Sequence, residues 1–317
     1  MNSFGNPLVR FAGGVMRRIV TFILLVGPFA TPAEAETATE RMWAAINTQD
    51  ATSLRNAIEQ GADPNEPNEE GRVPLYRALV LQNQLLIETL LGLGADPNAK
   101  DHRGDPLLFT AMSVGSAPAS LTLIGAKADA NAKDTIGMSP LAFAMTLEQP
   151  QLVAALIEAG ADVNAPSAAS DGGAPAAPIF LALRSGKLAF VRQLIAAGAD
   201  VDTRDDKGST PLHRAVLAQP ADYMTALVSA LLDAGADPNA MRPEGGAPIH
   251  NLVFGADSLP PEAVAHTATL LARHGADMNL AAAIDGATAL DIARSKGDQR
   301  SAELLAAMGG ACRNSCD

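Results

Sequence analysis

A five-residue phrase, Gly-Ala-Asp-x-Asn, recurs along the chain and constrains its fold more than any other feature. Full copies occupy residues 61–65, 94–98, 160–164, 235–239 and 275–279, and variants occupy residues 127–131 and 198–202. Lys127 replaces the glycine in the first variant, and Asp202 replaces the asparagine in the second. The copies that begin at 61, 94, 127 and 160 are each 33 residues apart. A fixed period of this length predicts a stack of one repeated supersecondary unit.

Two helices are predicted before each phrase. The longer one is apolar, as in residues 85–91, and the glycine of the phrase ends it in a left-handed conformation. The start of the shorter helix is indicated by residues that can cap it, and Ser139, Thr210 and Thr288 are predicted N-caps. Prolines that suit the first helical turn stand at Pro74, Pro140, Pro178, Pro211 and Pro248.

The segment Thr210-Pro211-Leu212-His213, together with the period and the phrase, resembles the ankyrin repeat. The resemblance implies an all-α ankyrin-repeat solenoid in which each unit is a helix, a tight turn, an antiparallel helix and a projecting β-hairpin loop. A hydrophobic content of 48% with only 4% aromatic residues suits such small-residue helix packing. We expect eight units, whose first helices begin near Glu40, Val73, Pro106, Ser139, Ala177, Thr210, Ala247 and Thr288.

Several units depart from the regular pattern. The link between Asn164 and Ala177 is five residues longer than usual, and its composition predicts a flexible hairpin finger. Units six and seven carry about four and seven extra residues between their helices, so we expect locally altered turns there. In unit three, Pro106-Leu107 replaces Thr-Pro, which makes its start the weakest match. The polar first and last units are expected to cap the stack.

The N-terminal 35 residues have the order of a secretory signal peptide. Arg17 and Arg18 precede an apolar run from Ile19 to Ala30, and Ala33-Glu34-Ala35 forms a cleavage site. The run is shorter than the roughly 20 residues of a membrane span, although a retained anchor is the alternative. We therefore expect cleavage after Ala35, an array over residues 36–310, a tail over 311–317, and a periplasmic or secreted protein. Either Met1 or Met16 could be the start of translation.

The charge of the mature chain limits the classes of partner that it is expected to bind. Residues 36–317 hold 20 basic and 34 acidic residues, a formal charge of −14. Binding to nucleic acid requires clustered Lys and Arg, which are absent from the sequence, and anionic membrane surfaces are disfavoured for the same reason. We expect no nucleic-acid partner and no stable membrane insertion once the signal peptide is removed.

Cys312 and Cys316 are the only cysteines, and they stand in the last six residues. In an exported chain they are candidates for a disulfide that fastens the tail. A redox-active pair is the alternative, but no thioredoxin-like pattern surrounds the C-x-x-x-C spacing.

The sequence contains no recognisable catalytic, cofactor-binding or metal-binding motif. G-x-S-x-G, H-E-x-x-H, P-loop and dinucleotide fingerprints are all missing. The family resemblance assigns His213 and His250 to hydrogen bonds with local backbone, and no Cys or carboxylate stands beside them at zinc-ligand spacing. Acid pairs such as Asp205-Asp206 are expected on solvated hairpin tips. We therefore expect no enzyme, no cofactor and no bound metal.

The resemblance implies binding of a protein on the concave side, by hairpin tips and the exposed edge of the first helices. Candidate binding residues on this basis are Arg72, His102, Arg103, Ile136, Met138, Lys207, Arg242 and Phe254. Leu147 and Leu217 could join them or could pack between helices as core. The charged tips could also serve only solubility.

Two functions remain open. The first is a periplasmic binder of one exported protein, as an inhibitor or immunity factor. The second is a scaffold or chaperone-like support for envelope or stress-response proteins. The sequence identifies neither the partner nor the oligomeric state.

Overall fold

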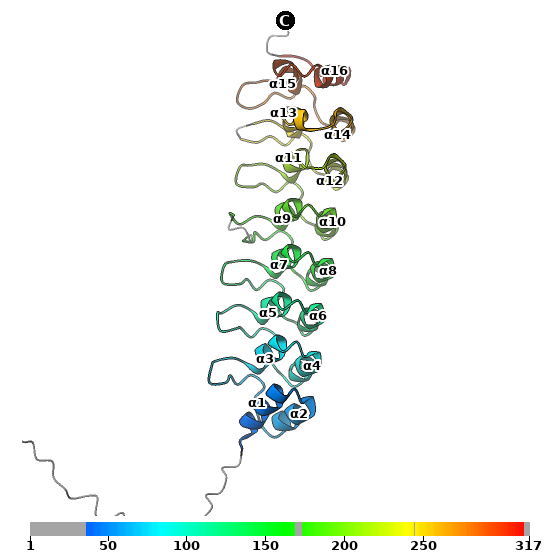
Figure 1. Ribbon diagram of the computed structural model, residues 1–317. Coiled ribbons are helices and arrows are strands. Elements are labelled where there is room, and N and C mark those ends of the chain that lie inside the picture. The colour runs from blue at the N-terminus through cyan, green and yellow to red at the C-terminus, as the bar shows by residue number, and fades with distance from the viewer. Residues whose placement is uncertain (1–35, 169–172, 244, 314–317) are drawn as a thin grey trace, which may run out of the picture.

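The structure, a computed structural model, describes residues 36–168, 173–243 and 245–313. The predicted signal peptide and Cys316 lie outside the described residues, so export and the Cys312–Cys316 disulfide stay predictions. The described part is an all-α solenoid of sixteen α-helices arranged as eight stacked pairs (Figure 1). The predicted fold class is therefore confirmed.

The first helix of each pair lies in an inner row, between the outer helices and the loops (Figure 1). These inner helices are α1 Ala38–Thr48, α3 Pro74–Val80, α5 Leu107–Ser113, α7 Pro140–Thr146, α9 Pro178–Ser185, α11 Pro211–Ala215, α13 Pro248–Phe254 and α15 Ala289–Ser295. All five predicted prolines occupy the first helical turn, where no intrahelical donor is needed. In unit three Pro106 is the N-cap and the helix begins one residue later.

The second helices form the outer row. They are α2 Ala51–Glu59, α4 Gln84–Gly92, α6 Ala117–Gly125, α8 Pro150–Glu158, α10 Leu188–Ala196, α12 Ala221–Asp233, α14 Pro261–Arg273 and α16 Gln299–Ala307. The extra residues of units six and seven mainly lengthen this row, because α12 and α14 have 13 residues where the other outer helices have 9. Unit seven adds a 3-10 helix, η1 Ala256–Ser258.

Each residue type of the repeated phrase has a structural task. The glycine, as in Gly94 with φ of 94°, takes the left-handed conformation that ends the outer helix. The alanine is buried in every copy except the last, where Ala276 is half-buried, and the aspartate accepts a hydrogen bond from the backbone N–H two residues later, as Asp96 does from Asn98. Lys127 adopts the glycine conformation with φ of 71°, which confirms the predicted register.

The asparagine of the phrase joins each unit to the next one. Asn65 donates from Nδ2 to the carbonyl oxygen of Gly94 at 3.0 Å and accepts from the N–H of Asp96 at 2.7 Å. The same pair of bonds is made by Asn131, Asn164, Asn239 and Asn279. Asn98 makes only the accepting bond, from the N–H of Asp129 at 2.7 Å. The asparagine of the phrase therefore fastens one unit to the next along most of the array.

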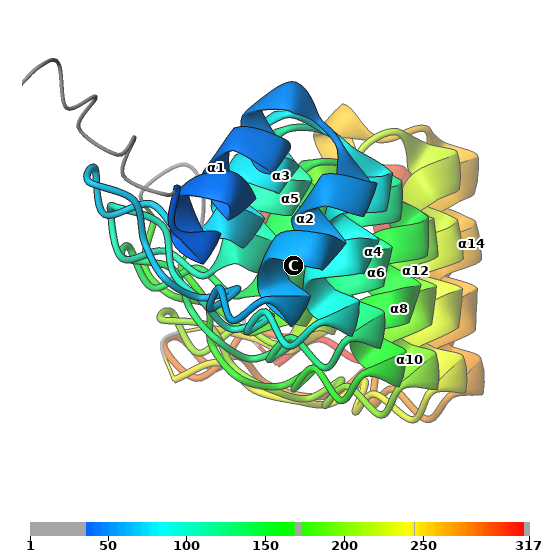
Figure 2. The same cartoon turned by 90° about the horizontal axis from the view of Figure 1, so that it is seen from below.

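The apolar residues of all eight units form one continuous core, from Met42 in α1 to Leu305 in α16. Inner helices pack on inner helices and outer helices on outer helices. Viewed along the stack, the inner helices, the outer helices and the loops occupy separate regions (Figure 2). One helix pair alone cannot bury its apolar face, so the units are stable only as an array.

The projecting loops are hairpin-shaped, but the expected β-strands do not form in the described residues. Only two isolated bridges occur there, Lys100 with Pro106 and Ser167 with Ala176. The second bridge closes the long link of unit five, whose residues 169–172 lie outside the described residues. The loops are instead held by side chains at their tips.

Candidate protein-binding face

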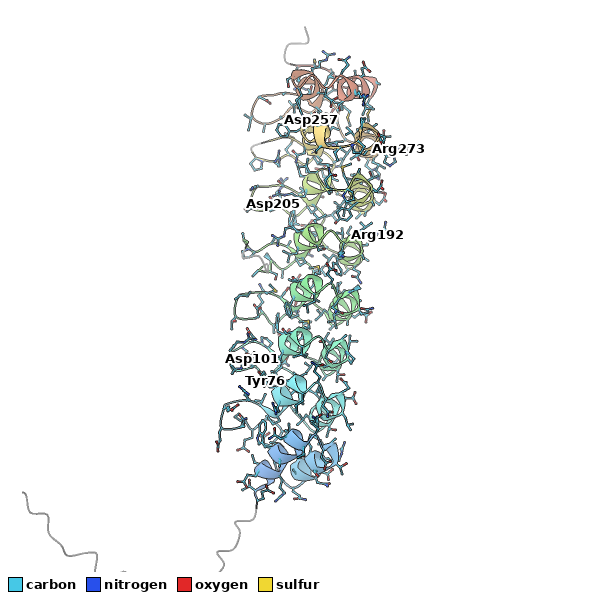
Figure 3. All side chains as sticks on the ribbon, in the orientation of Figure 1. Tyr76, Asp101, Arg192, Asp205, Asp257 and Arg273 are labelled. Atoms are coloured by element: carbon cyan, nitrogen blue, oxygen red, sulfur yellow. The ribbon has the colours of Figure 1, made fainter. Side chains whose placement is uncertain are left out.

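The loops and the inner helices together make one side of the molecule. We call the inner face the exposed side chains of the inner helices α3 to α15 together with the hairpin tips. Tyr76, Asp101 and Asp205 lie on this side of the stack, while Arg192 and Arg273 lie on the outer helices (Figure 3). All eight predicted binding residues belong to the tips or to the inner helices.

Four hairpin tips are built in the same way by an Asn or Asp followed three residues later by Gly. The side-chain oxygen accepts from the backbone N–H groups two and four residues later, as Asp134 does from Ile136 at 3.1 Å and Met138 at 2.7 Å. The same residue donates its own N–H to the carbonyl oxygen four residues later. Asn68, Asp101 and Asp205 repeat this pattern. This motif was visible in the sequence and was missed.

Asp205 corrects the expectation that the Asp205-Asp206 pair is a solvated turn. Its side chain is only 9% exposed and is paired with the Arg214 guanidinium from α11. Burial alone would raise the pKa of this carboxyl, but hydrogen bonds from Arg214 and from the N–H groups of Ser209 and Lys207 hold its pKa below the usual value. Asp205 therefore stabilises the tip.

Arg72 and His102 contact Tyr76, an inner-helix residue that the sequence analysis missed. The Arg72 guanidinium lies 5.8 Å from the centre of the Tyr76 ring, and the His102 ring meets the same ring edge-on at 5.9 Å. Arg103 is exposed and pairs with Asp101 at 3.3 Å. Units two and three thus share a polar and aromatic cluster at their tips.

Ile136 and Met138 lie in the same hairpin tip, before α7, but only one of the two side chains is exposed. Ile136 is 67% exposed, as predicted for a surface residue. Met138 is only 3% exposed and belongs to the core, so its assignment as a binding residue was wrong. The reason is the tip itself, because the hydrogen bonds to Asp134 turn residue 138 inward beside the start of α7.

The remaining candidates lie in units six and seven. Lys207 is exposed at a tip, and Phe254, at the end of α13, is 72% exposed with the Lys296 ammonium 5.4 Å from its ring centre. Arg242 is half-buried and donates to Asn251 Oδ1 at 2.8 Å, so it mainly holds its own loop against α13. Leu217 is 45% exposed, whereas Leu147 packs against the core.

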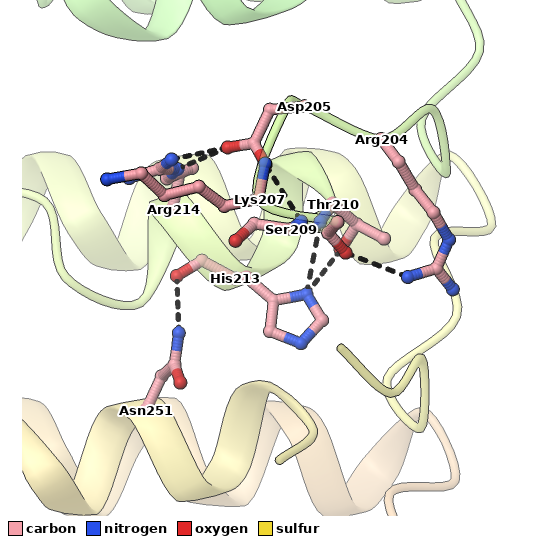
Figure 4. Close-up of polar contacts among 9 residues, drawn as sticks. Arg204, Asp205, Lys207, Ser209, Thr210, His213, Arg214 and Asn251 are labelled. Atoms are coloured by element: carbon pink, nitrogen blue, oxygen red, sulfur yellow. Dashed lines mark hydrogen bonds and ion pairs between the residues drawn. The ribbon is translucent and has the colours of Figure 1, made fainter. Parts of the chain in front are cut away.

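His213 and His250 hold consecutive units together. Because the Thr210 N–H donates to Nδ1 of His213, the neutral ring carries its proton on Nε2 and donates to the Gly246 carbonyl of the next unit at 3.0 Å. His250 makes the equivalent bonds to Ala247 and Leu280. Burial lowers the pKa of His213 to about 4 and also lowers that of His250. The two histidines therefore bond to the next unit as well as to the local backbone, which was their predicted role. Figure 4 shows the contacts around His213.

The exposed charges of the two helix rows differ in sign. The exposed charged side chains on the described inner helices α3 to α15 are Arg184, Arg214 and Arg294, and no acid is exposed on these helices. The outer helices α4 to α16 instead expose three arginines against six acids, which are Glu88, Glu158, Asp222, Asp233, Glu262 and Glu303. The inner helices are therefore less acidic than the outer helices, while the hairpin tips of the inner face also expose acids such as Glu70 and Asp206.

A pocket of about 500 Å³ opens between units five and six on the inner face. Its apolar walls include Phe180 and Leu183 of α9, Ala218 and Leu227. Four basic and two acidic side chains also line it: Arg184, Arg204, Lys207, Arg214, Asp205 and Asp206. The sequence analysis named only Lys207 of this group as a binding residue.

The same described ranges contain neither a metal-binding cluster nor a membrane-spanning helix. No three His, Cys, Asp or Glu side chains gather there in a way that could hold a metal ion. None of the helices in that part of the chain is both long and apolar enough to cross a membrane.

Known proteins share this architecture. A family model described as ankyrin repeats (3 copies) matches residues 169–242. Among solved structures, the ankyrin repeat domain of Bcl-3, described as a unique member of the IκB protein family, is 23% identical with a TM-score of 0.54, over 66% of this chain and 92% of that one. An ankyrin repeat domain from Acinetobacter baumannii AYE is 26% identical with a TM-score of 0.49, over 75% and 98%. A search of curated proteins found no match.

Proposed function

Since this chain is an ankyrin-repeat solenoid, a fold that serves typically as a non-catalytic protein-interaction module, we propose that its inner face binds one exported partner protein. The observation that carries the proposal is the pair of large apolar side chains exposed there on neighbouring units six and seven, Leu217 and Phe254. Both lie six residues after the first-turn proline of their unit, which is Pro211 in α11 and Pro248 in α13. Exposed apolar surface of this kind marks interaction sites on soluble proteins.

The compartment is part of the proposal. The basic, apolar and Ala-x-Ala series of residues 17–35 supports export to the periplasm, where the chain would act as an inhibitor or immunity factor. Mass measurement of the protein from fractionated cells tests this. We expect a mature N-terminus at Glu36 or within a few residues of it; the full-length chain in the cytoplasm would contradict export.

The role is tested by affinity purification of the mature protein after crosslinking in the cells that produce it. A single partner in a one-to-one complex that survives dilution supports an inhibitor or immunity factor. Many weakly held clients would instead favour a scaffold or chaperone-like support. Absence of any attached protein would contradict the binding function itself.

A further inference from the structure

The pocket between α9 and α11 is deep, and part of its wall is apolar. It reaches Leu227 of the outer helix α12, which is only 1% exposed, and it passes the Phe180 ring of α9. Its volume of about 500 Å³ exceeds what one large side chain requires. A pocket of this depth suits an anchoring residue at the centre of an interface, where fully desolvated contacts contribute most of the binding energy.

The rim of the pocket is basic. Arg184 and Arg214 come from the inner helices, and Arg204 and Lys207 come from the tip of unit six. The acid Asp205 is already held by Arg214 and by backbone N–H groups of its own tip. Asp206 also lines the opening, so four basic side chains stand there against two acids. The net charge of the opening is therefore positive and favours an approaching negative charge, in a protein whose outer helices expose mainly acids.

Two exposed apolar side chains extend the surface beyond the pocket. Leu217 lies two residues after the end of α11, and Phe254 occupies the equivalent position one unit further along the stack. Both are large and mostly solvated, so an extended segment that enters the pocket could also cover them.

We propose that this pocket anchors a large apolar side chain presented by an acidic segment of the partner protein. The proposal rests on the proposed protein-binding function and adds the place and the chemistry of the contact. Acidic residues beside the anchor would face the basic rim, while further apolar residues would cover Leu217 and Phe254.

The test places a photo-reactive benzoylphenylalanine at Leu217, in the full chain and in the producing cells. The matched control carries the same residue at Leu85, an exposed leucine on outer helix α4. Attached peptides are sequenced by mass spectrometry. We expect attachment at position 217 and not at 85, to segments with net negative charge that contain an aromatic or long aliphatic residue.

Two pairs of variants then test the pocket itself, with the urea midpoint checked for each. Lys207→Glu reverses a charge at the rim, and Arg192→Glu makes the same change on outer helix α10. Ala174→Trp fills the opening from an exposed loop position, and Ala189→Trp is its control on α10. We expect both pocket variants to reduce capture at least about fivefold and both controls to leave it unchanged.

The outcomes separate the two proposals. Basic or neutral attached segments, equal attachment at 85, or unchanged capture by Lys207→Glu and Ala174→Trp would overturn the pocket assignment and leave the binding function intact. Absence of attachment at every position would contradict the binding function.

Discussion

Lys127 holds a conformation that every other copy of the phrase gives to glycine. Its φ of 71° costs a residue with a side chain about 1 kcal/mol, partly offset because glycine is freer in the unfolded chain. We expect Lys127→Gly to raise the urea midpoint at unchanged slope. Gly94→Ala, at the equivalent position with φ of 94°, should lower it. A lower midpoint for Lys127→Gly would contradict the argument.

Asp202 keeps only half of the bond pair that joins units. It accepts from the N–H of Asp237 at 2.9 Å, but a carboxylate has no N–H to donate to the Gly235 carbonyl. We expect Asp202→Asn to add about 0.5 kcal/mol of stability, because the bond lies at the surface. The converse change, Asn239→Asp, removes the donor to Gly275 and should cost a similar amount in urea unfolding. Destabilisation by Asp202→Asn would refute this reading.

At the scale of the element, the short helix α11 depends on a neutral His213. Its pKa of about 4 in the folded state lies below the unfolded value of 6.5, so the unfolded chain binds more protons between these values. Stability should therefore fall as pH drops from 6.5 to about 4, by on the order of 3 kcal/mol for this group. His250, whose pKa is also lowered, adds to the same trend.

The measurement is the free energy of unfolding against pH. In His213→Gln the side chain can still accept the hydrogen bond from the Thr210 N–H, but it does not titrate. The stability of this variant should therefore depend less on pH. The double variant with His250→Gln should be flatter still. A wild-type stability that is constant between pH 7 and pH 4 would show that these histidines are not buried in neutral form.

At the scale of the whole molecule, the inner face and the core must respond differently to polar substitution. Ile136→Ser with Phe254→Ser should change stability by less than about 1 kcal/mol, because both side chains are exposed, and should reduce partner capture. Met138→Ser should cost about 2–4 kcal/mol, because it removes a buried side chain. Thermal unfolding and pull-down measure the two effects.

The control for this comparison is Leu85→Ser on α4, an equally exposed leucine of the outer row. It should leave both the melting temperature and partner capture unchanged. If the Ile136 and Phe254 variant still captures the partner, these two side chains are not part of the interface.

The sequence by itself determined the array, the register of the units and the helix starts. Each is set by local chemistry: a first-turn proline, an N-cap such as Ser139, and a left-handed glycine such as Gly94 act within one turn of the chain. The conformation of Lys127 followed from the same register. For this reason the eight units were predictable although two of them have longer outer helices.

Only the tertiary structure decided which loop residues face solvent. Met138 and Ile136 are two residues apart, yet one is core and the other surface, because hydrogen bonds to Asp134 set the direction of the tip. The pocket likewise combines Phe180, Lys207 and Leu227, which belong to different elements of two units. Such sites depend on how neighbouring units stack. The repeat pattern predicts that the units stack, but it does not predict which side chains remain exposed where two units meet.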